Sequence, residues 1–217
     1  MDAFNKLEEI FRRFPGIGPR QAKRFVYHLL TQSKGEMQDF TSLLGQLHSY
    51  TATCPECGRF FTVSETEKQT EQISGKSSAC SICRDQNRDR SVLMVVSKDI
   101  DLLAVEKSRA FSGVYFVLGG NIPILDEAPE HRIRQKELLA RVESLKTNSQ
   151  LSEIILATSV NPEGEHTAQY LSSLLRPVLE TAVRITALGR GLSTGTELEY
   201  SDSDTLRSAL ENRRISR

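Results

Sequence analysis

The clearest chemical signal in the sequence is a pair of Cys-x-x-Cys motifs. Cys54-Pro55-Glu56-Cys57 is followed after 22 residues by Cys80-Ser81-Ile82-Cys83, and together they contain all four cysteines of the chain. Two such pairs supply four thiolates for a tetrahedral zinc site, which then has no open position for catalysis. Disulfide bonds and a redox-active motif are the alternatives, but a redox motif is expected once, beside a βαβ unit. The spacing therefore predicts one structural Zn²⁺ per chain, held by Cys54, Cys57, Cys80 and Cys83.

A second candidate site is the segment Phe14-Pro15-Gly16-Ile17-Gly18-Pro19. Pro15 ends one predicted helix, and Pro19 suits the first turn of the next. Gly16 and Gly18 permit a tight turn with an exposed backbone, and N–H groups at a helix start attract anions. An ordinary helix turn is the alternative, but the segment resembles the helix-hairpin-helix motif, which binds DNA phosphates without reading sequence. We therefore expect phosphate contacts at Gly16, Gly18, Arg20, Lys23 and Arg24.

A third segment, Thr158-Ser159-Val160-Asn161-Pro162-Glu163-Gly164-Glu165, follows a predicted strand. It resembles the Toprim domain of topoisomerases, primases and recombination proteins, in which an Asp-x-Asp pair precedes Glu-Gly-Glu. The resemblance places Ser159 and Asn161 at the Asp positions, and Ser97 where catalytic Toprim proteins end the first strand with Glu. Because Mg²⁺ sites depend on carboxylate oxygens, these replacements argue against phosphodiester chemistry. Glu163 and Glu165 leave at most a weak divalent-cation site, and their ordinary interpretation is that they cap the following helix.

Two kinds of periodicity indicate the elements that must position these residues. Apolar residues recur at helical spacing in three N-terminal stretches, at about 4–14, 22–30 and 39–50. From residue 91 onward, apolar runs typical of buried parallel strands lie at Val92–Val96, Val114–Leu118, Ile154–Ala157 and Val183–Leu188. Helical patterns alternate with them at Ile100–Lys107, Arg132–Leu145 and Glu165–Val178. This order predicts a right-handed, mostly parallel α/β sheet, followed by a short helix at Ser203–Asn212 capped by Ser203 or Asp204.

The charges of the chain balance overall but not locally. The sequence has 28 Lys+Arg and 28 Asp+Glu, whereas residues 1–34 hold seven cations and three anions, a net charge of +4. A weaker basic stretch, Arg207–Arg217, ends the chain. No apolar run is long enough to span a membrane, and charges in Met1–Ile10 argue against a signal peptide, so we expect a cytoplasmic protein.

The predicted organisation has four parts. They are a helix-hairpin-helix module at 1–52, a small four-cysteine zinc module at 53–90, a Toprim-like domain at 91–190 and a C-terminal loop and helix at 191–217. The fold class is α/β with an added helical module.

In this order, the hairpin, the paired Cys motifs and the Toprim-like sheet resemble the RecR family of bacterial recombination mediators over nearly the whole chain. The resemblance extends to Leu198-Glu199-Tyr200, although Ser193-Thr194 departs from the Pro-Val that the family tends to have. Members of the family are not nucleases. They form ring-shaped oligomers that encircle DNA and, with RecO and RecF, help load RecA onto gapped DNA. The resemblance thus implies a non-catalytic, sequence-independent DNA-binding mediator that forms a homo-oligomer and has RecO and RecF as partners.

An enzyme is the alternative function. A Toprim-type, Mg²⁺-dependent nuclease or primase-like protein would use Glu163 and Glu165 with a third carboxylate such as Asp99 or Asp101. The missing Asp-x-Asp pair favours the mediator.

Overall fold

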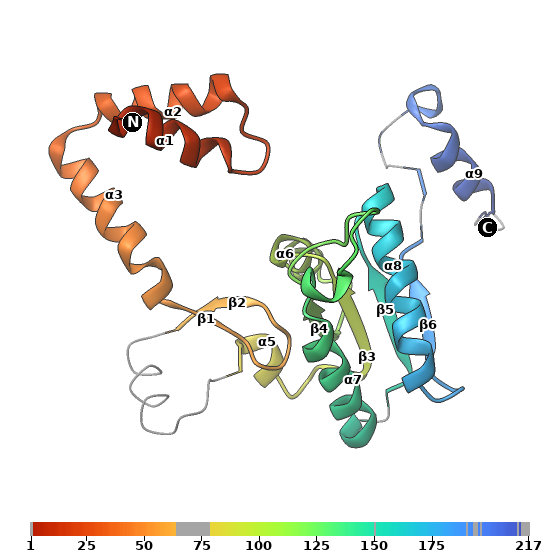
Figure 1. The fold of residues 1–217 in the computed structure, drawn as a ribbon. Coiled ribbons are helices and arrows are strands. Elements are labelled where there is room, and N and C mark those ends of the chain that lie inside the picture. Colours follow the sequence, from red (N-terminus) through yellow and green to blue (C-terminus); the bar gives the residue numbers. More distant parts are fainter. Residues whose placement is uncertain are drawn as a thin grey trace, which may run out of the picture. The chain divides into compact units, whose positions relative to one another are not determined.

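The computed structural model describes residues 2–63, 79–149, 151–189, 191–192, 195, 197–211 and 213 (Figure 1). Between the two Cys motifs, residues 64–78 therefore lie outside the described residues. The same holds for the pair Ser193-Thr194 and for the basic residues Arg214 and Arg217. The described chain forms two compact units, residues 2–52 with 62–63, and residues 53–61 with 79 onward.

The first unit is helical. It contains α1 (Ala3–Arg12), α2 (Pro19–Thr31), α3 (Lys34–Gln46) and the 3-10 turn η1 (Leu47–Ser49). Asp2 caps α1 by accepting a hydrogen bond from the Asn5 N–H at 2.9 Å, and Ser33 begins α3 with a capping box. These helices confirm the predicted helical N-terminus.

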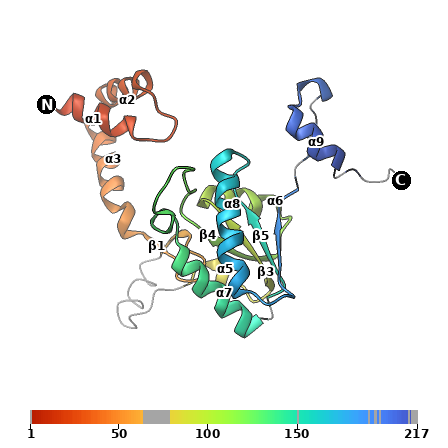
Figure 2. The same ribbon diagram turned by 45° about the vertical axis from the view of Figure 1, so that its right-hand side comes forward.

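The helices α1 and α2 form a hairpin whose two members pack against each other (Figure 2). The ring of Phe11 meets that of Phe25 edge-on, with 5.5 Å between the centroids. Ala22 and Val26 of α2 are buried, as their helical spacing requires. Burial of this apolar stripe holds the loop between the helices in place.

The second unit is built on a parallel sheet. Its strands are β3 (Asp89–Val96), β4 (Gly113–Val117), β5 (Glu153–Ala157) and β6 (Arg184–Ala187), in the spatial order β4-β3-β5-β6. All three strand pairs are parallel, with Val95 of β3 opposite Phe116 and Leu156. The helices that follow β3, β4 and β5 are α6 (Asp99–Ser108), α7 (Gln135–Ser149) and α8 (Pro162–Leu175). The predicted alternation of strands and helices is confirmed.

Each face of the sheet has its own core, because successive residues of a strand point to opposite sides. On one face, Leu93, Val95 and Phe116 pack with apolar residues of α7 and α8. On the other face, Met94, Val96 and Tyr115 pack with Leu102 of α6 and with the four cysteines. The cysteines are therefore part of the sheet's own core.

Short elements complete the chain. They are β1 (Thr51–Thr53), which pairs with β2 (Phe60–Thr62), the helix α5 (Ser81–Arg84), the 3-10 turns η2 (Pro129–His131), η3 (Arg176–Val178) and η4 (Leu198–Tyr200), and α9 (Ser203–Glu211). The cap of α9 is Asp202, which accepts a hydrogen bond from the Thr205 N–H at 2.9 Å, so the prediction of Ser203 or Asp204 as cap was wrong by one or two residues. Among the described residues, no helix combines the length and apolar character that a membrane crossing requires.

Candidate metal centre and nucleic-acid interface

The four cysteines converge on one buried point. Their sulfur atoms all lie within 4.8 Å of one another, and every one of the four residues is at least 98% buried. The first motif, with its following turn, forms what we call the first knuckle (Cys54–Arg59), closed by a 2.8 Å hydrogen bond from the Cys54 N–H to the Arg59 carbonyl. The second knuckle (Cys80–Cys83) opens α5, and its Cys80 N–H donates to the Cys54 sulfur at 3.3 Å.

The protonation of the thiols is strongly coupled at this separation. Hydrogen bonds from Cys57, Cys80 and Cys83 hold the pKa of the Cys54 thiol below its usual range. Contacts with Cys54, Cys57 and Cys80, together with burial, raise the pKa of the Cys83 thiol. Four thiols that share one site cannot all ionise without a cation, and a divalent ion that favours sulfur would permit it. The donor set therefore fits a metal ion, and in the described part of the chain no other group of Cys, His, Asp and Glu does so.

The hairpin loop has the geometry that its sequence predicts. Gly16 has φ of 75°, in the left-handed region, whereas Gly18 is extended, with φ of −83° and ψ of 171°, and serves as the N-cap of α2. Pro19 is the first residue of α2. The first turn of a helix leaves N–H groups without partners inside the helix, so the backbone here is open to an anion.

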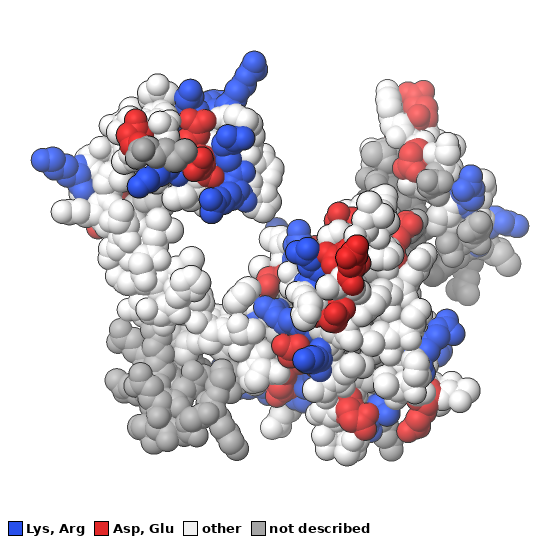
Figure 3. Space-filling model, in the orientation of Figure 1, with Lys and Arg blue, Asp and Glu red and all other residues white. Residues whose placement is uncertain are grey.

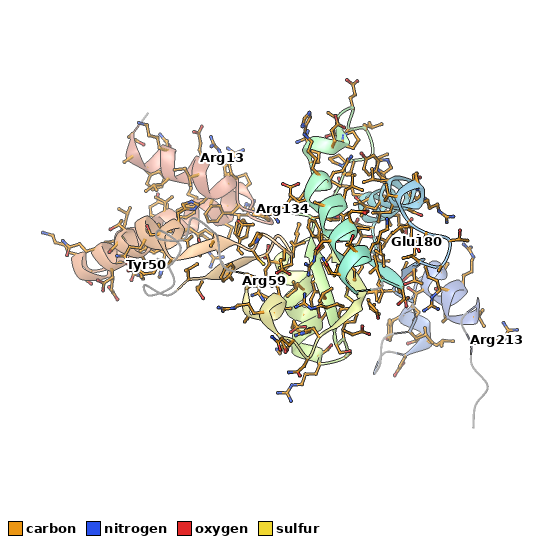
Figure 4. All side chains as sticks on the ribbon, turned by 90° about the horizontal axis from the view of Figure 1, so that it is seen from below. Arg13, Tyr50, Arg59, Arg134, Glu180 and Arg213 are labelled. Atoms are coloured by element: carbon orange, nitrogen blue, oxygen red, sulfur yellow. The ribbon has the colours of Figure 1, made fainter. Side chains whose placement is uncertain are left out.

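Five cations flank this loop. The predicted residues Arg20, Lys23 and Arg24 lie in the first two turns of α2 and are exposed. Arg12 and Arg13, at the end of α1, are exposed on the other side of the same loop, and Figure 4 labels Arg13. The prediction from the sequence omitted this pair, although its position directly before Phe14-Pro15 was a usable signal. Lys and Arg side chains are visible on the surface of the helical unit in Figure 3.

The carboxyl end of the sheet holds neutral side chains where a Toprim enzyme holds carboxylates. Ser97 is fully buried at the end of β3, and its hydroxyl donates a 2.5 Å hydrogen bond to Oδ1 of the Asn121 side chain. The Asn121 amide in turn reaches the Ser159 hydroxyl at 3.5 Å. A network of hydroxyl and amide groups therefore connects two of the three positions singled out by the resemblance.

The third position and the nearby acids serve the helices. The N-cap of α8 is Asn161, which accepts the Gly164 N–H at 2.8 Å, whereas Glu163 and Glu165 lie in the first turn, where the predicted interaction with the helix dipole places them. Negative charge in a first turn favours the positive end of the helix dipole.

Two further acids that an enzyme was expected to use are engaged elsewhere. The Asp99 carboxylate accepts the Phe60 N–H at 2.8 Å, and the Asp101 carboxylate accepts the Lys98 N–H at 2.9 Å. The first contact joins β2 to the start of α6, and the second fixes the backbone at the N-cap of α6.

Comparisons with known proteins agree with this geometry. Residues 4–48 match the family model described as RecR, helix-hairpin-helix, residues 91–188 match the Toprim domain, and residues 191–214 match RecR, C-terminal. The recombination protein RecR of Staphylococcus aureus strains Newman, USA300 and bovine RF122 / ET3-1 is 36% identical to the chain over 212 residues. The match covers 98% of this chain and 96% of each relative.

Proposed function

This chain belongs to the RecR family of recombination proteins, and from that premise we propose that it acts as an oligomeric clamp on DNA that helps load a recombinase at gaps. Membership makes the chain a recombination and repair protein and not an enzyme. The alternative of a Toprim-type nuclease or primase is therefore wrong.

The exposed cations around the hairpin loop carry the DNA-binding part of the proposal. Arg20, Lys23 and Arg24 would contact phosphates from the first turns of α2, with Arg12 and Arg13 joining them from α1. Gly18 would let the backbone approach, while Gly16 forms the turn. Contacts of this kind neutralise phosphates without reading bases, so binding should be independent of sequence.

The four cysteines would hold one Zn²⁺. Cys54, Cys57, Cys80 and Cys83 supply four buried sulfur ligands, and four thiolates select a soft or borderline ion in tetrahedral geometry. When bound, the ion would add folding free energy and polarise no substrate, since the protein fills every position. Glu163 and Glu165 are not required for any metal in this proposal.

Exposed apolar side chains of the helical unit support self-association. Leu43 and Leu44 of α3 are 67% and 53% exposed, and Phe40 and Leu47 extend the same surface. Large exposed apolar surfaces mark protein contacts. Several copies around one duplex would multiply a modest affinity through effective concentration.

The remaining assignments follow the family. RecO and RecF would be the protein partners, RecA the recombinase, and the cytoplasm the location. We assign residues 1–52 to DNA binding, 53–90 to the metal, and 91–190 to the scaffold and partner surface.

The salt dependence of DNA binding tests the hairpin. If the five flanking cations each neutralise one phosphate, the slope of log affinity against log salt is about −4.5 per subunit, and Lys23→Ala with Arg24→Ala should reduce it by about 1.8. Fluorescence anisotropy on duplexes of unrelated sequence, between about 50 and 200 mM salt, measures this slope.

The matched control removes two exposed lysines elsewhere. Lys34→Ala with Lys107→Ala changes the net charge equally, but Lys34 lies beyond the far end of α2 and Lys107 lies on α6. An unchanged slope in the hairpin variant, or an equal loss in the control, would show that the hairpin is a fold element only.

A further inference from the structure

The strand β4 lies at the edge of the sheet and yet is completely buried. Every residue from Gly113 to Val117 is buried, whereas the other edge strand, β6, is partly or fully exposed along its length. An uncovered edge strand presents unpaired backbone groups that invite pairing with another chain. Something other than a strand must therefore cover β4.

The covering groups come from the segments around the cysteines. The Leu118 N–H donates to Val96 of β3 at 2.9 Å, so the Val117 backbone, one residue earlier, faces away from the sheet. The Val117 N–H donates to the Cys57 carbonyl at 2.7 Å, which places the first knuckle on this edge. At the other end of β4, the Gly113 carbonyl accepts a 3.2 Å hydrogen bond from Arg88, which follows the second knuckle.

The first knuckle fits closely against β4. Gly58 has φ of 72°, and a Cβ there would stand 2.9 Å from the Val117 carbonyl oxygen, so only glycine permits this approach. Arg134 reaches over both segments and donates to the carbonyls of Gly58 and Val117 (Figure 4).

Besides Arg134, the ion pair between Arg141 and Glu56 also joins the first knuckle to the sheet domain, but it contributes little net stability. Arg141 of α7 pairs with Glu56 at 2.7 Å, with the Arg141 side chain only 6% exposed. In the described structure, however, the buried Nε and Nη2 atoms of Arg141 have no hydrogen-bond partner. A buried charge with unsatisfied donors contributes little net stability, because the cost of its desolvation offsets the attraction. The cover therefore needs another attachment.

The metal ligands provide that attachment. Cys57 lies in the first knuckle, and Cys83 is tied to β3 through Arg90, whose side chain donates to the Cys83 carbonyl at 2.9 Å. An ion bound by both knuckles would therefore link the cover of β4 to the strand beside it. We propose that the metal centre closes the edge of the Toprim-like sheet by clamping the first knuckle onto β4. This inference rests on the proposed Zn²⁺ site, and it assigns the ion to the sheet instead of to a separate finger.

Hydrogen exchange of the full chain tests the clamp. Mass spectrometry compares metal-loaded protein with protein stripped by chelator under reducing conditions, using peptides from β4, β5 and β6. If the first knuckle detaches, the hydrogen bond from the Val117 N–H to the Cys57 carbonyl and the two hydrogen bonds of Arg134 are lost. Each of these three contacts is worth roughly five-fold in local opening, so exchange at the outer edge of β4 should rise by about 100-fold. Exchange in β5 and β6 should stay within about three-fold. Unchanged exchange at β4, or an equal rise in all strands, would overturn the proposal.

A variant that leaves the ligands intact gives an independent test. Arg134→Met removes the two hydrogen bonds to Gly58 and Val117 but no sulfur, and should raise β4 exchange by about 25-fold at full metal content. Arg132→Met, an exposed neighbour, should leave β4 as in the wild type. No effect of Arg134→Met would contradict the clamp.

Elemental analysis of the starting protein separates the two possible failures. Folded protein without metal would refute both the Zn²⁺ site and the clamp. Metal-loaded protein whose β4 exchange ignores the metal would refute the clamp alone.

Discussion

The two glycines of the hairpin loop are glycine for different reasons. Gly16 has a positive φ, where a side chain costs about 1 kcal/mol or more. Gly18 has an ordinary extended backbone, and among the described residues no atom outside its immediate chain neighbours lies within 4 Å of the position that its Cβ would take. The free protein thus offers no reason for glycine at position 18, and close approach of a phosphate does.

Substitution Gly18→Ser should therefore separate folding from DNA binding. Gly18 is the N-cap of α2, and Ser is preferred to Gly there because its hydroxyl accepts an N–H of the first turn, from Arg20 or Gln21. We expect stability to stay equal or to rise by a few tenths of a kcal/mol. The serine hydroxyl would then accept the hydrogen bond of the same first-turn N–H that would otherwise be donated to a phosphate. Losing one hydrogen bond to a charged group costs about 1.5–3 kcal/mol, or roughly 10- to 100-fold in affinity.

Thermal melts and DNA-binding titrations at fixed salt measure the two effects, with Gly16→Ser as the comparison. Gly16→Ser should lower the Tm by about 2–8 °C, since a residue with a Cβ is strained at this positive φ. A Gly18→Ser protein that binds DNA like the wild type would refute the inference that a phosphate reaches the start of α2. A large fall in the Tm of the Gly18→Ser protein would refute the claim that a side chain at position 18 meets no steric obstacle in the free protein.

Two further predictions concern the second unit. Cys57→Ser should reduce the metal content, measured by elemental analysis, from about one ion per chain to less than half, and should lower the Tm by about 10 °C. The control Ser81→Ala changes an exposed residue and should alter neither the metal content nor the Tm. Equal metal content in the Cys57 variant and the wild type would contradict the site. Glu106→Gln should destabilise the fold by about 1–3 kcal/mol at pH 7, because Arg88 binds the Glu106 carboxylate and holds its pKa below the usual range. Because the pKa of Glu106 is lower in the folded than in the unfolded protein, the ion pair stabilises the fold fully at pH values above the unfolded-state pKa. This stabilisation is lost as the pH falls through the folded-state pKa. The difference between wild type and variant in urea unfolding should therefore shrink from about pH 5 downward, and a pH-independent difference would argue against the ion pair.

The sequence predicts those parts of the fold whose signal is local. The run Val92–Val96 marks a strand buried on both faces, and the stripe through Ala22 and Val26 marks the buried side of a helix. The two Cys motifs predict their own convergence, because each pair is pre-formed by its spacing. These signals need no knowledge of distant segments.

Contacts between distant segments could not be predicted in this way. The hydrogen bond from the Val117 N–H to the Cys57 carbonyl involves backbone atoms only, so no residue type announces it. The tethers of Arg134 and Arg141 depend on which side of α7 meets the first knuckle. For this reason, the prediction from the sequence treated the four cysteines as a module apart from the sheet, whereas in the structure they pack in the core on one face of the sheet.

Retention on circular DNA tests the proposed clamp most directly. The protein is loaded on a gapped circular plasmid, challenged with high salt that dissolves phosphate contacts, and assayed before and after the circle is cut once. An oligomer that encircles DNA should remain on the circle and leave the linear form by its ends, and Lys23→Ala with Arg24→Ala should load poorly. Equal retention on circular and linear DNA, or complete release from both in high salt, would contradict the clamp.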